Sequence, residues 1–307
     1  MRTNVVFDSA GIELAGHLYL PEGPTAGPRP AIVVSHPATG VKEQAAGLYA
    51  DRLARAGFVT LTFDAAYQGE SGGRPRALED PAHRVEDIKA AVSFLATRDE
   101  VDSQRIGALG ICASGGYVVA ASATDHRVKA VATVSGVDIG RMFREGPDGK
   151  QDPAVLRGML DAAATARTAE ARGEAMGVFP VFPSSEADAR AAGQYAFEGW
   201  EYYCTGRAEH PRSAKGFTWN SVDRVAGFDA FRFIDLIAPR PLLMIVGRNA
   251  LTAHQTTAAF EEAKQPKELF WIDGASHVDL YDKEPYLPTA VSKLASFFSS
   301  RLQSTST

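Results

Sequence analysis

The chain has 307 residues, of which 45% are hydrophobic and 22% are charged, and its formal net charge at pH 7 is -5. This length and composition are typical of one large globular domain with a sizeable core. The acidic balance and the lack of a Lys/Arg cluster argue against a nucleic-acid partner, so we expect the partner to be a small molecule.

The first twenty residues alternate apolar and polar side chains and lack the continuous apolar stretch of a signal peptide or membrane span. We therefore expect a soluble, cytoplasmic protein with no membrane partner. Cys112 and Cys204 are too few for a disulfide framework, and the sequence has no CxxC or HExxH spacing. We expect neither a cofactor nor a metal, and exposed apolar edges are compatible with a homodimer.

In chain order, residues 3–20 predict two strands joined at Gly11, and the Pro/Gly-rich segment 21–30 predicts a surface loop. Apolar runs and helical patterns then alternate. Strands are expected at 31–36, 59–64, 105–110 and 128–135, with helices at 43–56, at 84–98 and from residue 113. This alternation predicts an α/β fold with a mostly parallel central sheet and helices on both faces.

The alternation stops between about residues 140 and 226. An Ala/Arg/Glu-rich helical stretch at 153–176 is followed there by an aromatic segment, and we interpret 141–226 as a lid or cap insertion. The remaining core, 1–140 and 227–307, resumes with a strand at 241–247, a helix at 253–264, a strand at 268–273 and a closing helix at 287–302.

The segment Gly110-Ile-Cys112-Ala-Ser114-Gly-Gly joins a strand to an apolar helix and matches the strand-turn-helix of a GxSxG nucleophile elbow, with cysteine in place of serine. A cysteine at a helix N-terminus is expected to have a lowered pKa, so we predict Cys112 as a reactive nucleophile. The alternatives are that Cys112 is an inert buried thiol or that Ser114 is the nucleophile. Cys204 has no comparable strand-turn-helix context with flanking small residues.

His277 lies in the loop after the last predicted strand, where an α/β-hydrolase fold supplies its general base. The loop SHPATG after the strand at 31–36 predicts the oxyanion hole, whose amide donors we assign to Ala38 and Ala113. His36 is a candidate substrate-binding residue, with bracing of this loop as the alternative.

For the third catalytic residue the sequence departs from the usual pattern, because Asn249 stands where an aspartate normally follows the strand at 241–247. Asp138, which follows the strand at 128–135, is our first choice. Asn249 is the alternative, since an asparagine orients the histidine in papain-like proteases.

Four stretches, HPATGVKEQAAGLYADRLARAGFVTLTFDAAYQGESGG, GALGICASGGY, EYYCTGRAEHPRS and GASHVDLYD, resemble the dienelactone hydrolase-like α/β hydrolases. The resemblance is to their YcjY-like branch, which includes fungal polyketide transferase-like proteins. It covers nearly the whole chain and implies a Cys-centred hydrolase or acyl-transfer site at Cys112 and His277.

The predicted function is cleavage of an ester, lactone or thioester of a small apolar or aromatic acyl group through an acyl-enzyme. The alternatives are an acyltransferase on the same site and a non-catalytic ligand receptor with this fold. Lid aromatics are expected to roof the pocket, with Trp200 and Tyr203 binding substrate; the wider set is Phe179, Phe182, Trp200, Tyr202, Tyr203 and Trp219.

Overall fold

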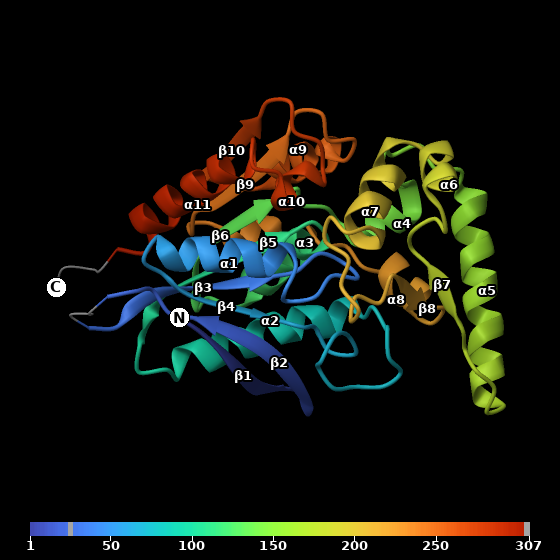
Figure 1. Cartoon of the computed structure of the whole chain (residues 1–307), viewed down its shortest axis with the longest axis horizontal. Helices are drawn as coiled ribbons and strands as arrows, with labels where there is room; N and C mark the ends of the chain where they lie inside the picture. The colour runs from blue at the N-terminus through green and yellow to red at the C-terminus, as the bar shows by residue number, and fades with distance from the viewer. Residues whose placement is uncertain (24–26, 304–307) are drawn as a thin grey trace.

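A mostly parallel sheet forms the centre of the computed structural model, which describes residues 1–23 and 27–303. Its spatial order is β1-β2-β4-β3-β5-β6-β9-β10 (Figure 1). Only the pairings of β2 are antiparallel, to β1 and to β4, among these described strands. The strands are β1 (Arg2–Ser9), β2 (Ile12–Tyr19), β3 (Arg29–Ser35), β4 (Val59–Phe63), β5 (Val101–Ile111), β6 (Val128–Val134), β9 (Leu242–Gly247) and β10 (Lys267–Ile272).

The central strands are buried on both faces, which explains their nearly continuous apolar sequences. Every residue of β4 and β9 is buried, and β6 has only Lys129 partly exposed. The predicted strands are therefore confirmed, with β5 starting at Val101, before the predicted residue 105. Of the predicted loop at 21–30, residues 24–26 lie outside the described part of the chain, and β3 begins at Arg29.

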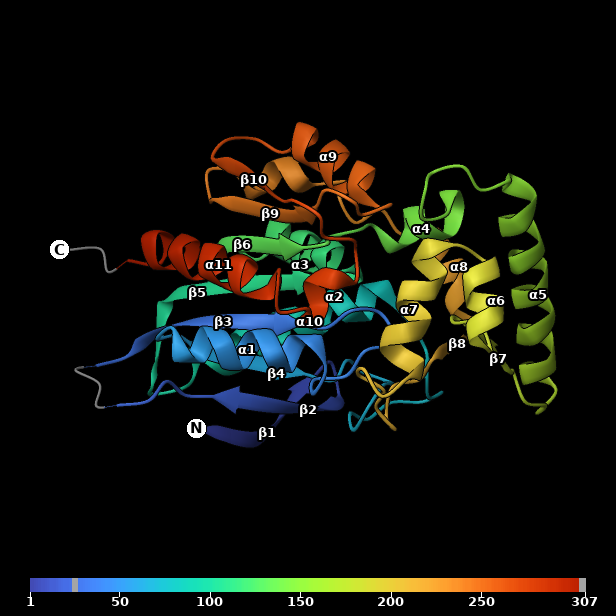
Figure 2. The same ribbon diagram turned by 45° about the horizontal axis from the view of Figure 1, so that its top comes forward.

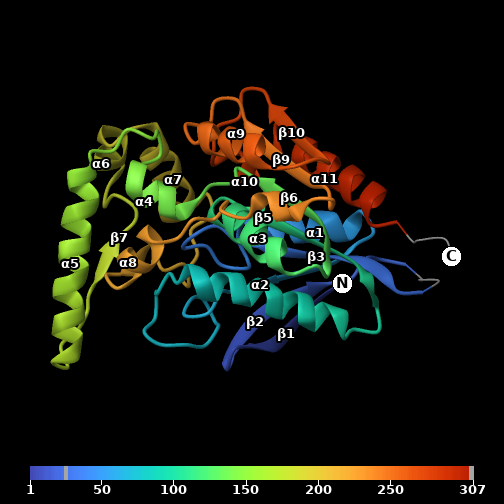
Figure 3. The same cartoon turned by 180° about the vertical axis from the view of Figure 1, so that it is seen from behind.

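Helices cover both faces of the sheet (Figures 2 and 3). One face carries α1 (Ala45–Arg55) and α11 (Leu287–Arg301), and the other carries α2 (Pro81–Ala96), α3 (Ala113–Thr124), α9 (Ala253–Glu262) and the short η1 (Ile234–Ile237). Helix α2 begins earlier than predicted because the Asp80 side chain accepts hydrogen bonds from the amides of Ala82 and His83. This arrangement is the predicted α/β-hydrolase architecture.

The insertion gathers at one end of the sheet, with α5 outermost (Figure 1). Its elements are α4 (Ile139–Glu145), α5 (Pro153–Ala171), β7 (Val178–Pro180), α6 (Glu186–Ala191), α7 (Gln194–Cys204), β8 (Gly216–Thr218) and α8 (Ser221–Ala226). The antiparallel β7–β8 ribbon was not predicted, because each strand has only three residues. We call this region the cap. A last short helix, α10 (Asp279–Asp282), follows β10.

The segment after α7 fastens the cap to the core. Arg212 pairs with Glu43 at 2.5 Å, and Glu43 also pairs with the buried Lys42 at 3.0 Å. The Ser213 hydroxyl donates a hydrogen bond to the Thr39 carbonyl at 2.8 Å. We refer to these five residues as the cap anchor. Lys42 is 1% exposed and also pairs with Asp64 at 2.8 Å, so Glu43 connects the cap residue Arg212 to a buried group of charges in the core.

No helix in residues 1–23 or 27–303 is both long and apolar enough to cross a bilayer.

Candidate active site

Cys112 lies at the sharp turn between β5 and α3. Its φ of 57° and ψ of -123° are values that non-glycine residues rarely adopt. The turn is held because the Cys112 amide donates to the Val134 carbonyl at 3.0 Å and the Cys112 carbonyl accepts from the Gly115 amide at 2.8 Å. A Cβ at Gly110 would lie 1.9 Å from the Ser114 carbonyl oxygen, so this close approach requires glycine. Backbone strain that the surroundings enforce is typical of a functional turn.

The Cys112 sulfur faces the amides of Ala38 and Ala113, the two donors predicted for the oxyanion hole. Burial raises the pKa of the thiol, and this effect exceeds the lowering by hydrogen bonds from the Tyr281 hydroxyl and from both amides. The prediction that the helix N-terminus would lower this pKa is therefore wrong, because desolvation outweighs the helix dipole. Cys112 therefore rests as a neutral thiol.

A tight turn shapes the loop that carries Ala38. The Gly40 amide donates to the Pro37 carbonyl at 3.0 Å, and Thr39 has a positive φ of 62°. The Thr39 hydroxyl donates to the Ala38 carbonyl at 2.6 Å. The Pro37 carbonyl, which shares a peptide unit with the Ala38 N–H, is held by Gly40, and this N–H faces the thiol.

A buried arginine braces this loop from behind. Arg84 of α2 is 3% exposed and donates to the His36 carbonyl and to the Ser114 hydroxyl, both at 2.8 Å. Its counter-ion is the buried Glu79, 3.7 Å away, which also accepts a hydrogen bond from the Tyr117 hydroxyl at 2.7 Å. Arg84 thus connects the oxyanion loop to the first turn of α3, and its charge lowers the pKa of Cys112.

His36 and Ser114 belong to this brace. The His36 Nδ1 lies 2.7 Å from the Pro37 carbonyl, and Nε2 accepts from the Ala65 amide at 3.1 Å. Burial and the Arg84 charge hold the pKa of His36 well below its usual value, so the ring is neutral. The prediction that His36 binds substrate is wrong, because the ring is 0% exposed and fully hydrogen-bonded. Ser114 donates to the His36 carbonyl at 2.5 Å and is equally enclosed.

His277 follows β10 and is 1% exposed. Its Nδ1 lies 2.6 Å from the Thr252 hydroxyl, and its Nε2 lies 3.1 Å from the Tyr281 hydroxyl. The Ser135 hydroxyl fixes the backbone by donating to the His277 carbonyl at 2.8 Å. Burial lowers the pKa of His277 to about 3, so the ring is neutral at pH 7 and able to accept a proton.

The structure places Thr252, rather than either predicted residue, beside the His277 ring. Asp138 instead caps α4 by accepting hydrogen bonds from the amides of Gly140 at 2.8 Å and Arg141 at 3.3 Å. Asn249 is exposed and donates to the Gly274 carbonyl at 3.1 Å. The prediction of Asp138, with Asn249 as alternative, is therefore wrong: one is used as a helix cap and the other as a turn residue.

Three tyrosine rings surround the thiol. Tyr281 of α10 hydrogen-bonds with Cys112, and Tyr195 and Tyr203 of α7 lie close enough for the Cys112 charge to raise their pKa, after burial, which is the larger cause. The Tyr203 hydroxyl is buried and has no hydrogen-bond partner in the described part of the chain. Sequence reasoning missed Tyr281, although its position four residues after His277 on a helical turn was a readable signal.

A cavity of about 310 Å³ opens above Cys112, a size suited to a small ligand. Its floor is made by Ala38, Cys112 and Ala113, and its walls come largely from the cap. The other lining residues are mostly apolar: Val137, Ile139, Met142, Phe143, Gln151, Met159, Phe179, Pro180, Val181, Tyr195 and Phe217. This cavity lies at the carboxyl ends of the strands, where α/β folds bind ligands.

Of the cap aromatics predicted to roof the pocket, Phe179 lines the cavity. Trp200 stacks on Phe197 with ring centroids 6.2 Å apart and is not among the lining residues, so its predicted substrate contact is not seen. Tyr203 stacks on Phe182 at 4.7 Å and approaches the thiol from outside this lining. The other two predicted aromatics pack against different rings: Tyr202 packs on Tyr281, and Trp219 packs on Phe179.

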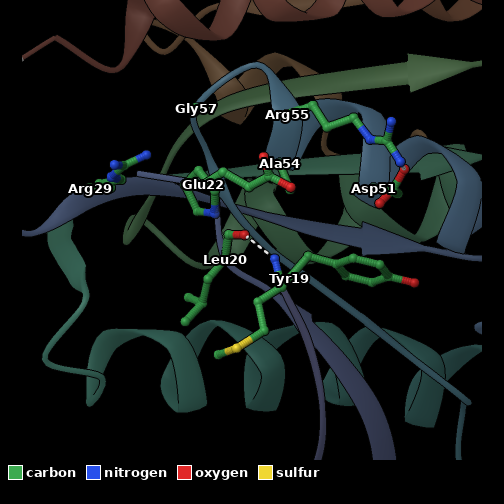
Figure 4. Close-up of a pocket in the computed structure, with 10 residues that line it drawn as sticks. Tyr19, Leu20, Glu22, Arg29, Asp51, Ala54, Arg55 and Gly57 are labelled. Carbon is green, nitrogen blue, oxygen red and sulfur yellow. Dashed lines mark hydrogen bonds and ion pairs between the residues drawn. The ribbon is translucent and has the colours of Figure 1, made fainter. Parts of the chain in front are cut away.

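A second hollow, of about 190 Å³, lies at the opposite ends of the strands (Figure 4). It is lined by Tyr19, Arg29, Asp51 and Arg55, among others, and Arg55 pairs with Asp51 at 2.9 Å. This hollow contains no nucleophile and base in contact, so it does not compete with the cavity above Cys112. In residues 1–23 and 27–303, no group of three or more His, Cys, Asp or Glu side chains is arranged to hold a metal ion.

The fold, the strained turn at Cys112 and the paired amide donors define an α/β hydrolase. Residues 14–176 match the model of the dienelactone hydrolase family. The chain belongs to this family, whose members act on ester bonds, in the branch that also holds fungal polyketide transferases.

The relatives agree with this assignment over most of the chain. The uncharacterized protein YcjY of Escherichia coli K12 is 40% identical, over 89% of each chain. The solved structure of the hypothetical protein PA2218 of Pseudomonas aeruginosa is 35% identical with a TM-score of 0.91, covering 98% of this chain and 94% of that one. The thiohydrolase aneE of Aspergillus aculeatus is 28% identical, over 87% of this chain and 83% of its own.

Proposed function

We propose that this protein cleaves an ester, lactone or thioester of a small apolar acyl group, with Cys112 as a covalent nucleophile. One observation carries the proposal: the Cys112 sulfur faces the amides of Ala38 and Ala113 at the floor of an apolar cavity. A nucleophile beneath two converging N–H donors is the arrangement that acyl transfer requires.

In the proposed reaction, the Cys112 thiol gives up its proton toward His277, and the sulfur attacks the carbonyl carbon. The amides of Ala38 and Ala113 stabilise the oxyanion that forms. The intermediate collapses to a thioester on Cys112, and the leaving alcohol or thiol departs with the proton that His277 returns. Water, deprotonated by His277, then releases the acid and restores the thiol.

The cavity limits the acyl group. Its volume of about 310 Å³ lies at the small end of the range for ligand pockets, so we expect an acyl group of modest size. Phe143, Phe179 and Phe217, with Met142 and Met159, make its walls apolar. The name thiohydrolase of the relative aneE supports a thioester as the bond that is cleaved.

Acyl transfer to another acceptor is the second candidate. It is supported by the fungal polyketide transferases in the same branch and by the 8% exposure of Cys112, which restricts water at the acyl-enzyme. A small alcohol or thiol added during turnover distinguishes the two reactions, because a transferase forms the new ester or thioester in preference to the free acid.

Intact-mass measurement after incubation with aryl ester and acyl thioester probes tests the proposal. We expect an acyl adduct on the wild type that maps to Cys112, is absent from Cys112→Ala, and forms at least 10²-fold more slowly in His277→Ala, which lacks the base. Cys204→Ala is the matched control, because Cys204 is the other free thiol and lies outside the cavity lining. Bound probe without adduct or turnover in the wild type would favour a ligand receptor.

A further inference from the structure

The hydroxyl of Tyr281 lies between the nucleophile and the base. It is 3.1 Å from the His277 Nε2 and also hydrogen-bonds with the Cys112 thiol. Among the interactions of the described residues, none joins the Cys112 sulfur directly to the His277 ring. The shortest route for a proton from the thiol to the base therefore passes through this phenol.

The ring of Tyr281 is held firmly in this position. It is 2% exposed and packs edge-on against Tyr202 with centroids 5.1 Å apart at 89°. The neighbouring backbone is fixed because the Tyr49 hydroxyl donates to the Leu280 carbonyl at 2.7 Å. With ring and backbone both fixed, the Tyr281 hydroxyl stays in contact with the site.

The groups facing the thiol from other elements do not replace Tyr281. Tyr195 and Tyr203 of α7 and Arg84 of α2 influence the Cys112 charge. Of these three side chains, Tyr195 packs its ring edge-on against the His277 imidazole with centroids 5.3 Å apart, and in the described part of the chain it makes no hydrogen bond to that ring. Unlike these three side chains, Tyr281 contacts both Cys112 and His277 through its hydroxyl.

We propose that Tyr281 is a catalytic residue that relays the proton between Cys112 and His277, an inference that rests on the proposed covalent function. The thiol proton moves to the Tyr281 oxygen while the phenol proton moves to the His277 Nε2. The products are a thiolate, a neutral tyrosine and an imidazolium, so protons and charge balance. The reverse transfer delivers the proton to the leaving group.

Thr252 sets the starting state for this relay. With the His277 Nδ1–H donating to the Thr252 hydroxyl at 2.6 Å, the Nε2 lone pair faces Tyr281 and accepts its proton. A threonine holds the tautomer without adding negative charge, unlike the carboxylate of a common triad. The imidazolium is therefore formed only when the thiol gives up its proton, and the relay couples the two events.

Alkylation of Cys112 by iodoacetamide across pH, followed by mass mapping, tests the relay without any substrate. We expect the pH midpoint to rise by about one unit or more in Tyr281→Phe, because a hydrogen bond to the thiolate is lost. Tyr286→Phe is the matched control: it removes a tyrosine hydroxyl that donates to the Gly274 carbonyl at 3.2 Å, and this hydroxyl contacts neither Cys112 nor His277, so its midpoint should equal that of the wild type. Equal melting temperatures of the wild type and Tyr281→Phe would exclude unfolding as the cause.

Acylation kinetics separate the relay from the proposed function. With a probe that acylates the wild type, Tyr281→Phe should react about 10²-fold or more slowly, and the wild-type rate in H₂O/D₂O mixtures should curve as expected for two protons in motion. An unchanged midpoint and rate in Tyr281→Phe, with Cys112 still acylated, would overturn the relay and leave the function intact. A shifted midpoint with no acylation by any probe would retain the Tyr281–thiol contact but overturn the function.

Discussion

The two sides of the nucleophile are built from opposite kinds of interaction. On the oxyanion side, the buried ion pair of Arg84 and Glu79 fixes the loop that presents Ala38. On the base side, His277 is held by the neutral hydroxyls of Thr252 and Tyr281, and no carboxylate contacts its ring in the described part of the chain.

This contrast means that a permanent charge supports the oxyanion side, whereas neutral hydrogen bonds position the base. The oxyanion side keeps a permanent positive charge behind donors that are already oriented, which is the electrostatic preorganisation that stabilises a developing anion. The base side avoids permanent charge, and its charge appears only when the thiol loses its proton. Three substitutions probe this difference, in decreasing order of expected effect.

Removing the arginine should cause the largest change. Arg84→Met leaves the buried Glu79 carboxylate without its counter-ion, so we expect the free energy of unfolding in guanidinium to fall by about 3–5 kcal/mol. The acylation rate of the folded fraction should fall by about 10²-fold as Ala38 loses its orientation. The double variant Arg84→Met/Glu79→Gln should regain much of the stability but not the rate. Full recovery of both would show that the guanidinium only neutralises Glu79.

Acid should destabilise the base side next. The pKa of His277 is about 3 in the folded protein and near 6.5 in an unfolded chain. The unfolded chain therefore binds a proton that the folded chain does not, so this stability is complete above pH 6.5 and is lost as the pH falls toward 3. We expect the free energy of unfolding to fall by about 2 kcal/mol between pH 7 and pH 5 from this group.

His277→Gln should remove that part of the pH dependence, as measured by guanidinium unfolding at pH 7 and pH 5. His126→Gln, at an exposed position, is the control and should keep the wild-type difference. If His277→Gln keeps the full difference as well, the imidazole is not the group that titrates. Buried His36, whose pKa is also lowered, retains its own contribution in every variant.

The orienting hydroxyl should give the smallest change. Thr252→Val keeps the shape but loses the hydrogen bond to the His277 Nδ1, so we expect acylation to slow by about tenfold, the equivalent of one hydrogen bond. Asp138→Asn and Asn249→Ala should remain within about twofold of the wild type, because neither side chain reaches the ring. A larger loss in Asp138→Asn than in Thr252→Val would restore the aspartate as the orienting residue.

The sequence predicted those features of the site that depend on strand ends. Cys112, His277, Ala38 and Ala113 each follow a strand, and the carboxyl ends of parallel strands meet at one edge of the sheet. The order of strands and helices, which the apolar pattern indicates, brings Ala38, Cys112 and Ala113 to the floor of one cavity and places His277 beside Tyr281. The buried strands and most helices were predictable for the same reason.

Other features depend on information that a sequence pattern does not hold. Thr252 rather than Asn249 reaches His277 because the turn after β9 directs Asn249 to the Gly274 carbonyl. From the sequence alone, Arg84 has the pattern of an exposed residue on an amphipathic helix. In the structure it is 3% exposed, because the loop that carries Ala38 covers it. The direction of the Cys112 pKa shift depends on the competition between burial and hydrogen bonding, which only the packed structure decides.

The cap anchor has a consequence for how substrates are chosen. Arg212 pairs with Glu43 and Ser213 donates to the Thr39 carbonyl, so the cap cannot swing away without breaking these contacts to the core. We therefore expect the cap to stay in place when a ligand enters, so that the opening into the cavity keeps a constant width. Under the proposed function, acyl groups are then selected by their width and length and not by the closure of a lid.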